Sequence, residues 1–214
     1  MSMLLAEELV LLLMDDETGH CEVPEREASQ GVALALVFEL SLRRALAVEG
    51  DTLALQRTTS TGDPLLDVAA HSVTALTPVA AVEKLAGEGV LEAALARLVS
   101  RGVLHDAAVW SPGIHLPRDP HPESTVRARL REVLAEGRGA NDQEAALVAL
   151  LHHLEIVPAV LPDDDPGITV PRAAEVASRS RPMQDYQGGP KKKRSWFNAI
   201  DLLDLVGQGL NIFN

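Results

Sequence analysis

Cysteine and aromatic residues are the two residue classes that this sequence largely lacks. The single cysteine, Cys21, excludes an internal disulfide framework and any metal site built from several thiolates. Aromatic residues make up only 3% of the 214 residues, so leucine, valine and alanine must fill the core. Leucine and alanine are strong helix formers, and 46% of the residues are hydrophobic. This composition favours a folded, mainly α-helical protein.

Signals for secretion and for membrane spanning are also lacking. The apolar run in residues 1–14 is interrupted by Glu7 and Glu8, and no basic segment precedes it as in a secretory signal. No run approaches the ~20 apolar residues that a transmembrane helix needs. We therefore expect a cytoplasmic protein, with peripheral association at the inner face of the membrane as an option.

Catalytic and metal-binding patterns are absent as well. The sequence contains no GxxxxGK[ST], GxGxxG, GxSxG or HExxH motif. His152 and His153 are adjacent, so on a helix they point about 100° apart and are poorly placed to share a metal. The aspartates at 163–165 are expected to form a solvated loop, and the acidic neighbours of Cys21 make it a poor nucleophile. The sequence predicts no enzyme, no cofactor and no metal site.

Helical periodicity dominates the chain up to Asp163, beyond which order is expected to weaken. The predicted helices cover residues 3–14, 31–47, 65–76, 77–85, 90–101, 123–136 and 143–154. The second of these is apolar on nearly all sides, so it is expected at the centre of the core. A turn at 49–51 before an alternating strand at 52–58 predicts one hairpin, and residues 103–104 with 107–110 predict a second.

Three local details refine this prediction. Asp63 followed by Pro64 is a helix-start signal, and Asn141 or Asp142 is expected to cap a later helix. Arg127, Arg129 and Arg131 are expected on an exposed helix face. The helix at 90–101, Gly102 and the hairpin after it also follow the order of a winged helix. Because residues 103–117 contain no lysine or arginine, DNA binding is a minor alternative, and nucleic acid is not an expected partner.

Charge is unevenly distributed along the chain. The last 24 residues hold four basic and two acidic residues, a net charge of +2, and the whole chain carries −12, which leaves −14 on residues 1–190. The basic cluster is followed directly by two aromatic residues and then by an apolar stretch with polar residues every three or four positions. The residues predicted to dock on a membrane or partner are Lys191, Lys192, Lys193, Arg194, Trp196, Phe197, Ile200, Leu203, Leu210 and Phe213.

This C-terminal pattern has several interpretations. A basic cluster, then aromatic residues at the level of the lipid headgroups, then an amphipathic helix are typical of a segment that binds an anionic lipid surface. The same segment is equally compatible with packing on its own domain, with pairing between two copies in a homo-oligomer, or with a docking peptide for a protein partner. The expected organisation is a compact helical domain over 1–177, a linker with the basic cluster over 178–194, and an amphipathic tail helix over 195–214.

An ordered set of segments resembles the Golgi phosphoprotein family, the phosphatidylinositol-4-phosphate readers of Golgi membranes. The segments are LLAEELVLLLMDDETG at 4–19, LVFELSLRRAL at 36–46, TGDPLLD at 61–67, RLVSRGVLHD at 97–106 and TVRARLREVL at 125–134. The resemblance covers about residues 3–162, and the arginine-rich, lysine-poor body suggests a bacterial, actinobacterial-type member. It implies a compact helical fold with β-hairpins, one of them serving self-association. It also implies a non-enzymatic adaptor that associates peripherally with membranes.

The resemblance fails at the lipid pocket of the eukaryotic members. The tryptophan and arginine positions of that pocket fall at about Pro24, Ala33, Glu88 and Leu91 here. None of these side chains binds a phosphate as arginine does, so we predict no phosphatidylinositol-4-phosphate binding at that place. The residues predicted to form a different anion-binding site are Arg26, Arg43 and Arg44.

Overall fold

The computed structural model describes residues 3–56, 60–108, 111, 113–180 and 182. Over these residues the chain is mainly helical, with a single antiparallel hairpin, and this confirms the predicted fold class. The helices are α1 (Leu5–Leu13), α2 (Glu25–Leu42), α3 (Pro64–Val73), α4 (Pro78–Gly87), α5 (Val90–Ser100), α6 (His121–Leu134), α7 (Asp142–His153), α8 (Val157–Val160) and α9 (Pro166–Ser178). The hairpin consists of β1 (Leu46–Glu49) and β2 (Thr52–Leu55), with Leu46 opposite Leu55.

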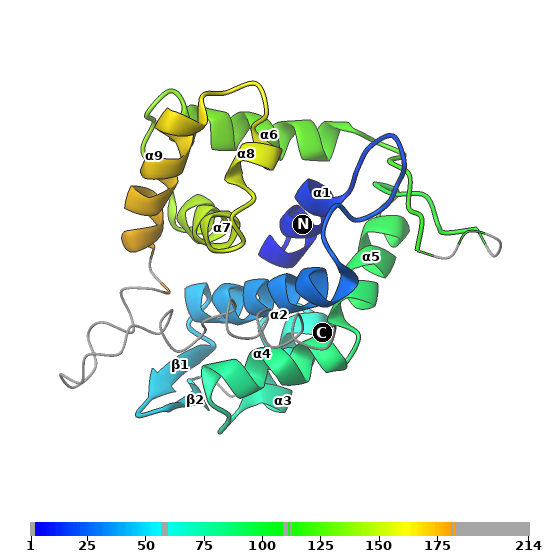
Figure 1. The fold of residues 1–214 in the computed structure, drawn as a ribbon. Helices are drawn as coiled ribbons and strands as arrows, with labels where there is room; N and C mark the ends of the chain where they lie inside the picture. The colour runs from blue at the N-terminus through cyan, green and yellow to red at the C-terminus, as the bar shows by residue number, and fades with distance from the viewer. Residues whose placement is uncertain (1–2, 57–59, 109–110, 112, 181, 183–214) are drawn as a thin grey trace, which may run out of the picture.

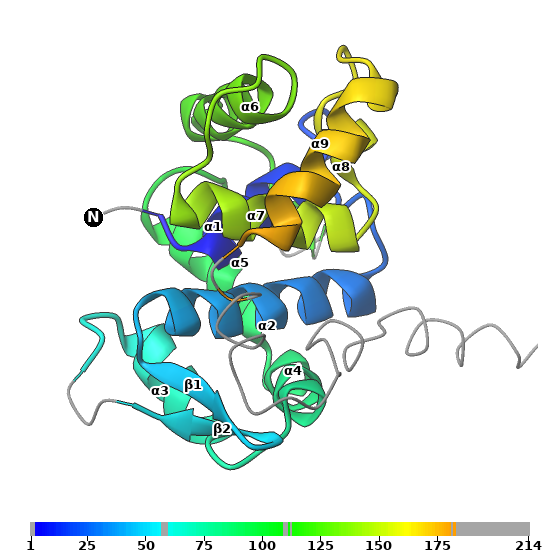
Figure 2. The same cartoon turned by 90° about the vertical axis from the view of Figure 1, so that its left-hand side faces the viewer.

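Helix α2 forms the centre of the molecule. Its residues 32–38 are consecutively buried, and each is at most 1% exposed, as expected for a helix that is apolar on all sides. In both views α1 and α7 lie on one side of α2, and the hairpin, α3 and α4 lie on the other (Figures 1 and 2). The core therefore continues through α2 and joins the two halves of the domain.

Helix α1 is buried along its whole length, between α2, α5, α6 and α7. The buried residues include Glu7 and Glu8, which interrupt its apolar sequence. A carboxylate removed from water costs several kcal/mol of folding free energy, on the order of the stability of a domain, unless it is paired. The position of α1 therefore requires cationic partners from other helices.

The predicted helix starts are confirmed at atomic detail. The Asp63 side chain accepts hydrogen bonds from the N–H groups of Leu65 and Leu66, with Pro64 at the first helical position of α3. At the start of α7, the Asn141 side chain accepts from the N–H of Glu144, whose carboxylate accepts from the N–H of Asn141 in return.

The boundary of the second helix differs from the prediction. It begins at Glu25 and ends at Leu42, whereas the sequence placed its end at about Ala47. Arg44 adopts a left-handed backbone with φ 54, and the N–H of Ala45 returns to the carbonyl of Leu40, which closes the helix. The residues after this turn, Leu46–Glu49, then form β1 and pair with β2.

Residues 109–110 of the second predicted hairpin lie outside the described residues. Among the residues described after α5, Leu104 and Pro117 form an isolated antiparallel bridge, and there are no paired strands of greater length. Beside this bridge the N–H of Arg118 donates to the carbonyl of Val103, and the N–H of His115 donates to Gly19, outside the segment. These contacts fold residues 113–118 back onto the body of the domain.

The expectation that order weakens directly beyond Asp163 is wrong for residues 166–178. Asp165 caps α9 by accepting the N–H of Gly167, and Pro166 occupies the first helical position. This helix packs on α7, and Ala173 is fully buried in the interface. The Asp-Pro signal at the start of α3 is therefore also present at the start of α9. The prolines around it suggested an irregular segment instead. Helix α9 ends at Ser178, and most of the linker and all of the tail lie outside the described residues.

Candidate functional site

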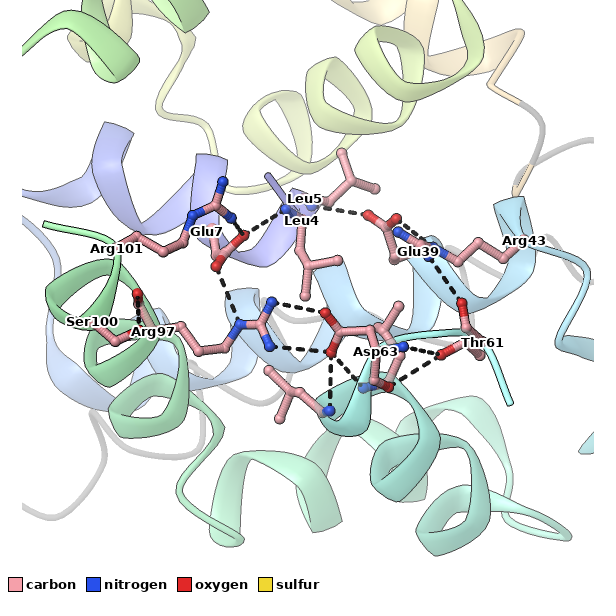
Figure 3. Close-up of polar contacts among 12 residues, drawn as sticks. Leu4, Leu5, Glu7, Glu39, Arg43, Thr61, Asp63, Arg97, Ser100 and Arg101 are labelled. Atoms are coloured by element: carbon pink, nitrogen blue, oxygen red, sulfur yellow. Dashed lines mark hydrogen bonds and ion pairs between the residues drawn. The ribbon is translucent and has the colours of Figure 1, made fainter. Parts of the chain in front are cut away.

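A network of buried ion pairs surrounds the N-terminus of α1 (Figure 3). The N–H groups at the start of a helix have no partner within the helix, and carboxylates bind two of them here. Leu4 N–H donates to Glu7 Oε2 at 2.7 Å, and Leu5 N–H donates to Glu39 Oε2 at 2.9 Å. Glu39 belongs to α2, so this carboxylate both satisfies the helix end and fixes α1 against the central helix.

Glu7 is the most deeply buried member of the network, because its side chain is completely removed from solvent. Arg97 Nε donates to its Oε1 at 3.1 Å, and Arg101 Nη1 donates to its Oε2 at 2.9 Å. Arg97 lies in α5 and Arg101 directly follows this helix, and both keep about 30% of their side chains exposed. The buried charge of α1 is thus connected to the surface through two guanidinium groups.

Arg97 also binds the residue that caps α3. Its Nη1 and Nη2 donate to Asp63 Oδ1 and Oδ2 at 3.2 and 2.8 Å, a two-pronged contact that matches the planar guanidinium. Burial lowers the pKa of Arg97, but the hydrogen bonds that it donates to Asp63 and the charge of Glu7 outweigh this effect, so the pKa is raised. Arg97 therefore stays charged and joins α1, α3 and α5 at one point.

A second pair continues the network along α2. Arg43 Nε donates to Glu39 Oε1 at 2.8 Å, and its Nη1 donates to the carbonyl of Thr61 at 3.4 Å. On the other side of α1, Arg129 Nη2 of α6 donates to Glu8 Oε1 at 2.8 Å. Burial raises the pKa of Glu8, against the opposing effect of Arg129.

Chemically, this arrangement is a charge-balanced structural cluster. Each of its carboxylates accepts a hydrogen bond from an arginine, and a carboxylate held in this way is a poor general base or nucleophile. No group of three or more histidine, cysteine and acidic side chains lies close enough to hold a metal within the described part of the chain. Burial raises the pKa of the Cys21 thiol, which also makes it a poor nucleophile.

The predicted exposed arginine face of α6 needs correction. Arg127 donates to Glu123 at 2.6 Å and Arg129 donates to buried Glu8, so both are used to neutralise acids inside the domain. Arg131 is the most exposed of the three, and it pairs with Asp164 at 3.1 Å. An amphipathic pattern places such residues at the surface, but it does not reveal that buried carboxylates lie beneath them.

The structure does not bring the predicted anion-binding residues together. Arg26 lies in the first turn of α2, whereas Arg43 and Arg44 follow its last turn, roughly 25 Å away at the rise of an α-helix. Arg26 and Arg44 are exposed, and Arg43 bonds Glu39. Whether any of them binds an anion stays a prediction. The predicted docking residues from Lys191 to Phe213 lie outside the described residues.

Two of the positions matched to the family's lipid pocket are buried. Ala33 is fully buried in α2 and Leu91 is 7% exposed, so a ligand in solvent reaches neither side chain. Pro24 is exposed before α2, and Glu88 forms an ion pair with Lys84 at 2.6 Å. As aligned, these four positions do not form one surface pocket.

Sequence reasoning missed the ion-pair network itself. Its signal was the pair of acids inside the apolar run of α1, which was used only as evidence against a secretory signal. The partners are 90 and 94 residues away in the chain, at Arg97 and Arg101. A single sequence does not specify which of its many arginines meets a buried acid.

Comparison with known families gives one match. The sequence profile of the family described as Golgi phosphoprotein 3 (GPP34) matches residues 5–196, a span that includes every helix and strand described above. No curated protein matches the chain.

Proposed function

The chain belongs to the Golgi phosphoprotein 3 (GPP34) family, a non-enzymatic adaptor family, and we propose that it works as an adaptor at an anionic membrane surface. Family membership over residues 5–196 is the observation that carries this proposal. The balanced ion pairs around α1 agree with it, because they stabilise a scaffold and leave no activated nucleophile among the residues of the network. No helix among the described residues is long and apolar enough to cross a bilayer.

The C-terminal segment supplies the chemistry for membrane contact. Residues 191–194 are all basic, and each lysine or arginine near an anionic membrane surface contributes about 1 kcal/mol of binding free energy. Trp196 and Phe197 follow at once, where an aromatic side chain would meet the boundary between headgroups and acyl chains. We expect the cations to attract the surface and the apolar residues up to Phe213 to insert.

The body offers a further apolar contact. Residues 107–117 contain no aspartate, glutamate, lysine or arginine, although the rest of the body is strongly acidic. Leu116 in this stretch is 44% exposed, and Ile114 is partly exposed. An uncharged surface with exposed aliphatic side chains is compatible with a membrane, from which the acidic surfaces would be repelled.

The test is co-sedimentation of the full-length protein with vesicles of phosphatidylcholine alone or with about one third phosphatidylserine. Replacing residues 191–194 with serine should strongly weaken binding to the anionic vesicles at low salt, and Trp196→Ser should weaken it at every salt concentration. Leu116→Ser should weaken it to a smaller extent. Arg179→Ser, at an arginine whose side chain is 70% exposed, is the control for loss of an exposed charge elsewhere.

Salt separates this proposal from docking on a protein partner. Vesicle binding through four cations should fall steeply between about 0.05 and 0.5 M salt, because added salt shortens the Debye length. Docking of an apolar helix in a protein groove should not depend on the salt concentration. Asp201 and Asp204 in the tail favour the protein-docking alternative, since cations are expected at those positions of a membrane helix. Equal sedimentation of the wild type and the serine variant, or none by either, would contradict the membrane proposal.

A further inference from the structure

The hairpin leaves the outer edge of β1 without a partner strand. In an antiparallel pair, successive residues alternately turn their N–H and C=O groups toward the neighbouring strand and away from it. The N–H of Gln56 donates to the carbonyl of Ala45 at 2.8 Å, so Ala45 faces β2. By the same alternation Ala47 faces β2, and Leu46 and Val48 face away. Among the described residues, no main-chain hydrogen bond reaches these outward groups of Leu46 and Val48.

The outer edge of β2, in contrast, is covered. The N–H of Leu53 donates to the carbonyl of Leu76 at 2.8 Å, and the N–H of Ala75 donates to the carbonyl of Leu53 at 2.8 Å. Ala75 adopts a left-handed backbone with φ 65, which alanine rarely does. The main contacts of β1 are with β2 and with α2, which leads into it, and both strands face the viewer below α2 in Figure 2. The fold therefore closes one edge of the hairpin and leaves the edge at β1 open.

The chain around β1 carries opposite charges at its two ends. Arg44 precedes the strand and is exposed, whereas Glu49 and Asp51 at the other end are exposed acids. Ala47, which has a small side chain, lies near the middle between these ends. Two copies of β1 that run antiparallel about Ala47 therefore bring the basic end of each strand beside the acidic end of the other. A parallel pair would bring like charges together, which is unfavourable.

We propose that the open edge of β1 binds β1 of a second copy of this chain, so that the two hairpins form one continuous antiparallel sheet. With Ala47 opposite Ala47 of the second copy, the outward groups of Leu46 meet those of Val48, and the two-fold axis repeats this contact. A slip of two residues in either direction leaves only one such reciprocal pair. The dimer thus satisfies the main-chain groups that an exposed edge presents to solvent.

This pairing goes beyond the membrane proposal and does not rest on it. Two joined copies carry two basic clusters at residues 191–194, so an anionic surface would attract both clusters at once. The test of the pairing is done without vesicles, so its outcome is independent of membrane binding.

Sedimentation of the full-length protein across the micromolar range measures the association. The average mass of the wild type should rise from one chain toward two as the concentration increases. Hydrogen exchange then locates the interface, because the amides of Leu46 and Val48 should exchange slowly only at the high concentration. The amide of Leu53, which donates to Leu76 within one chain, is the internal reference and should be equally protected at both concentrations.

Two variants and one control test the geometry. Val48→Pro removes an outward N–H that β2 does not use, so the hairpin should remain while the protein stays monomeric. Arg44→Glu places like charges together twice in the symmetric dimer and should raise its dissociation constant roughly tenfold. Adding Glu49→Arg to this variant restores opposite charges and should restore the association. Arg179→Glu reverses an exposed charge outside the hairpin and should match the wild type, and circular dichroism checks that each variant is folded.

The proposal is overturned by a mass of one chain at every concentration. It is also overturned if the protein associates while exchange at Leu46 and Val48 stays unchanged, or if association survives both Val48→Pro and Arg44→Glu. In the last case, loss of association in Leu116→Ser would assign the interface to residues 107–117. Loss in the variant with serine at residues 191–194 would assign it to the tail.

Discussion

The strongest stability prediction concerns Glu7, the fully buried carboxylate at the start of α1. Glu7→Gln keeps the size of the side chain and one acceptor oxygen, so the N–H of Leu4 can still be bonded. The substitution removes the negative charge between Arg97 and Arg101, and places an amide NH2 where a guanidinium donor needs an acceptor. Two partly buried cations then lose their shared contact with this carboxylate.

The magnitude follows from the exposure of the partners. Removing one member of a buried ion pair typically costs about 3–5 kcal/mol of unfolding free energy. The lower end applies here, because both arginines reach solvent and Arg97 keeps its contact with Asp63. We expect a loss of about 3 kcal/mol, which at a urea m-value of about 2 kcal/mol/M lowers the unfolding midpoint by about 1.5 M.

Urea unfolding followed by circular dichroism measures this shift, and Glu132→Gln is the matched control. Glu132 also pairs with an arginine, at 2.7 Å from Arg138, but its side chain is 49% exposed. Exposed pairs contribute at most about 1 kcal/mol, so the control midpoint should move by less than about 0.5 M. If Glu7→Gln and Glu132→Gln shift the midpoint equally with unchanged m-values, the network does not stabilise the fold as argued.

Three further predictions concern stability. In folded protein burial raises the pKa of Glu123 from 4.5 to about 7, so the folded state holds this proton more tightly than the unfolded chain. The unfolding free energy should therefore fall by on the order of 2 kcal/mol as pH rises from 4.5 to 7. Glu123→Gln should remove this part of the decline in pH-dependent urea unfolding. Gly87→Ala should raise the melting temperature, because the added Cβ would enter open space at the end of α4. The expected gain in the free energy of unfolding is up to about 1 kcal/mol. Gly31→Ala should gain less or destabilise, since its Cβ would lie 3.3 Å from side-chain atoms of both Leu9 and Leu154.

Local signals explain why most of the fold was predictable from the sequence. Asp63 with Pro64, Asn141 with Glu144, and the apolar sequence of α2 each determine structure through neighbours within four residues. The failures occurred where a distant contact decides. The segment after α5 pairs with itself at a single bridge between Leu104 and Pro117 and also bonds Gly19 through His115, and α9 packs on α7.

The ion-pair network belongs to that second class. Its essential contact joins Glu7 to Arg97, and the same guanidinium reaches Asp63, 34 residues earlier in the chain. Buried acids need cationic partners, because an unpaired carboxylate in the core is too costly. The composition of the sequence does not show which arginines these partners are. The expectation of an exposed arginine stripe on α6 failed for the same reason, since Arg129 neutralises Glu8 in a helix more than a hundred residues away.

The charge of the body decides how a membrane contact of this protein would work. Residues 1–190 carry −14, so an anionic surface repels most of the domain, but in physiological salt this repulsion extends only about 8 Å. Four cations at about 1 kcal/mol each give a binding free energy of only about 4 kcal/mol, which corresponds to a millimolar dissociation constant. Electrostatic attraction alone is therefore too weak to hold the protein on a membrane. Insertion of apolar side chains must supply the remainder, and this is why Trp196→Ser should weaken binding at salt concentrations where the basic cluster no longer contributes.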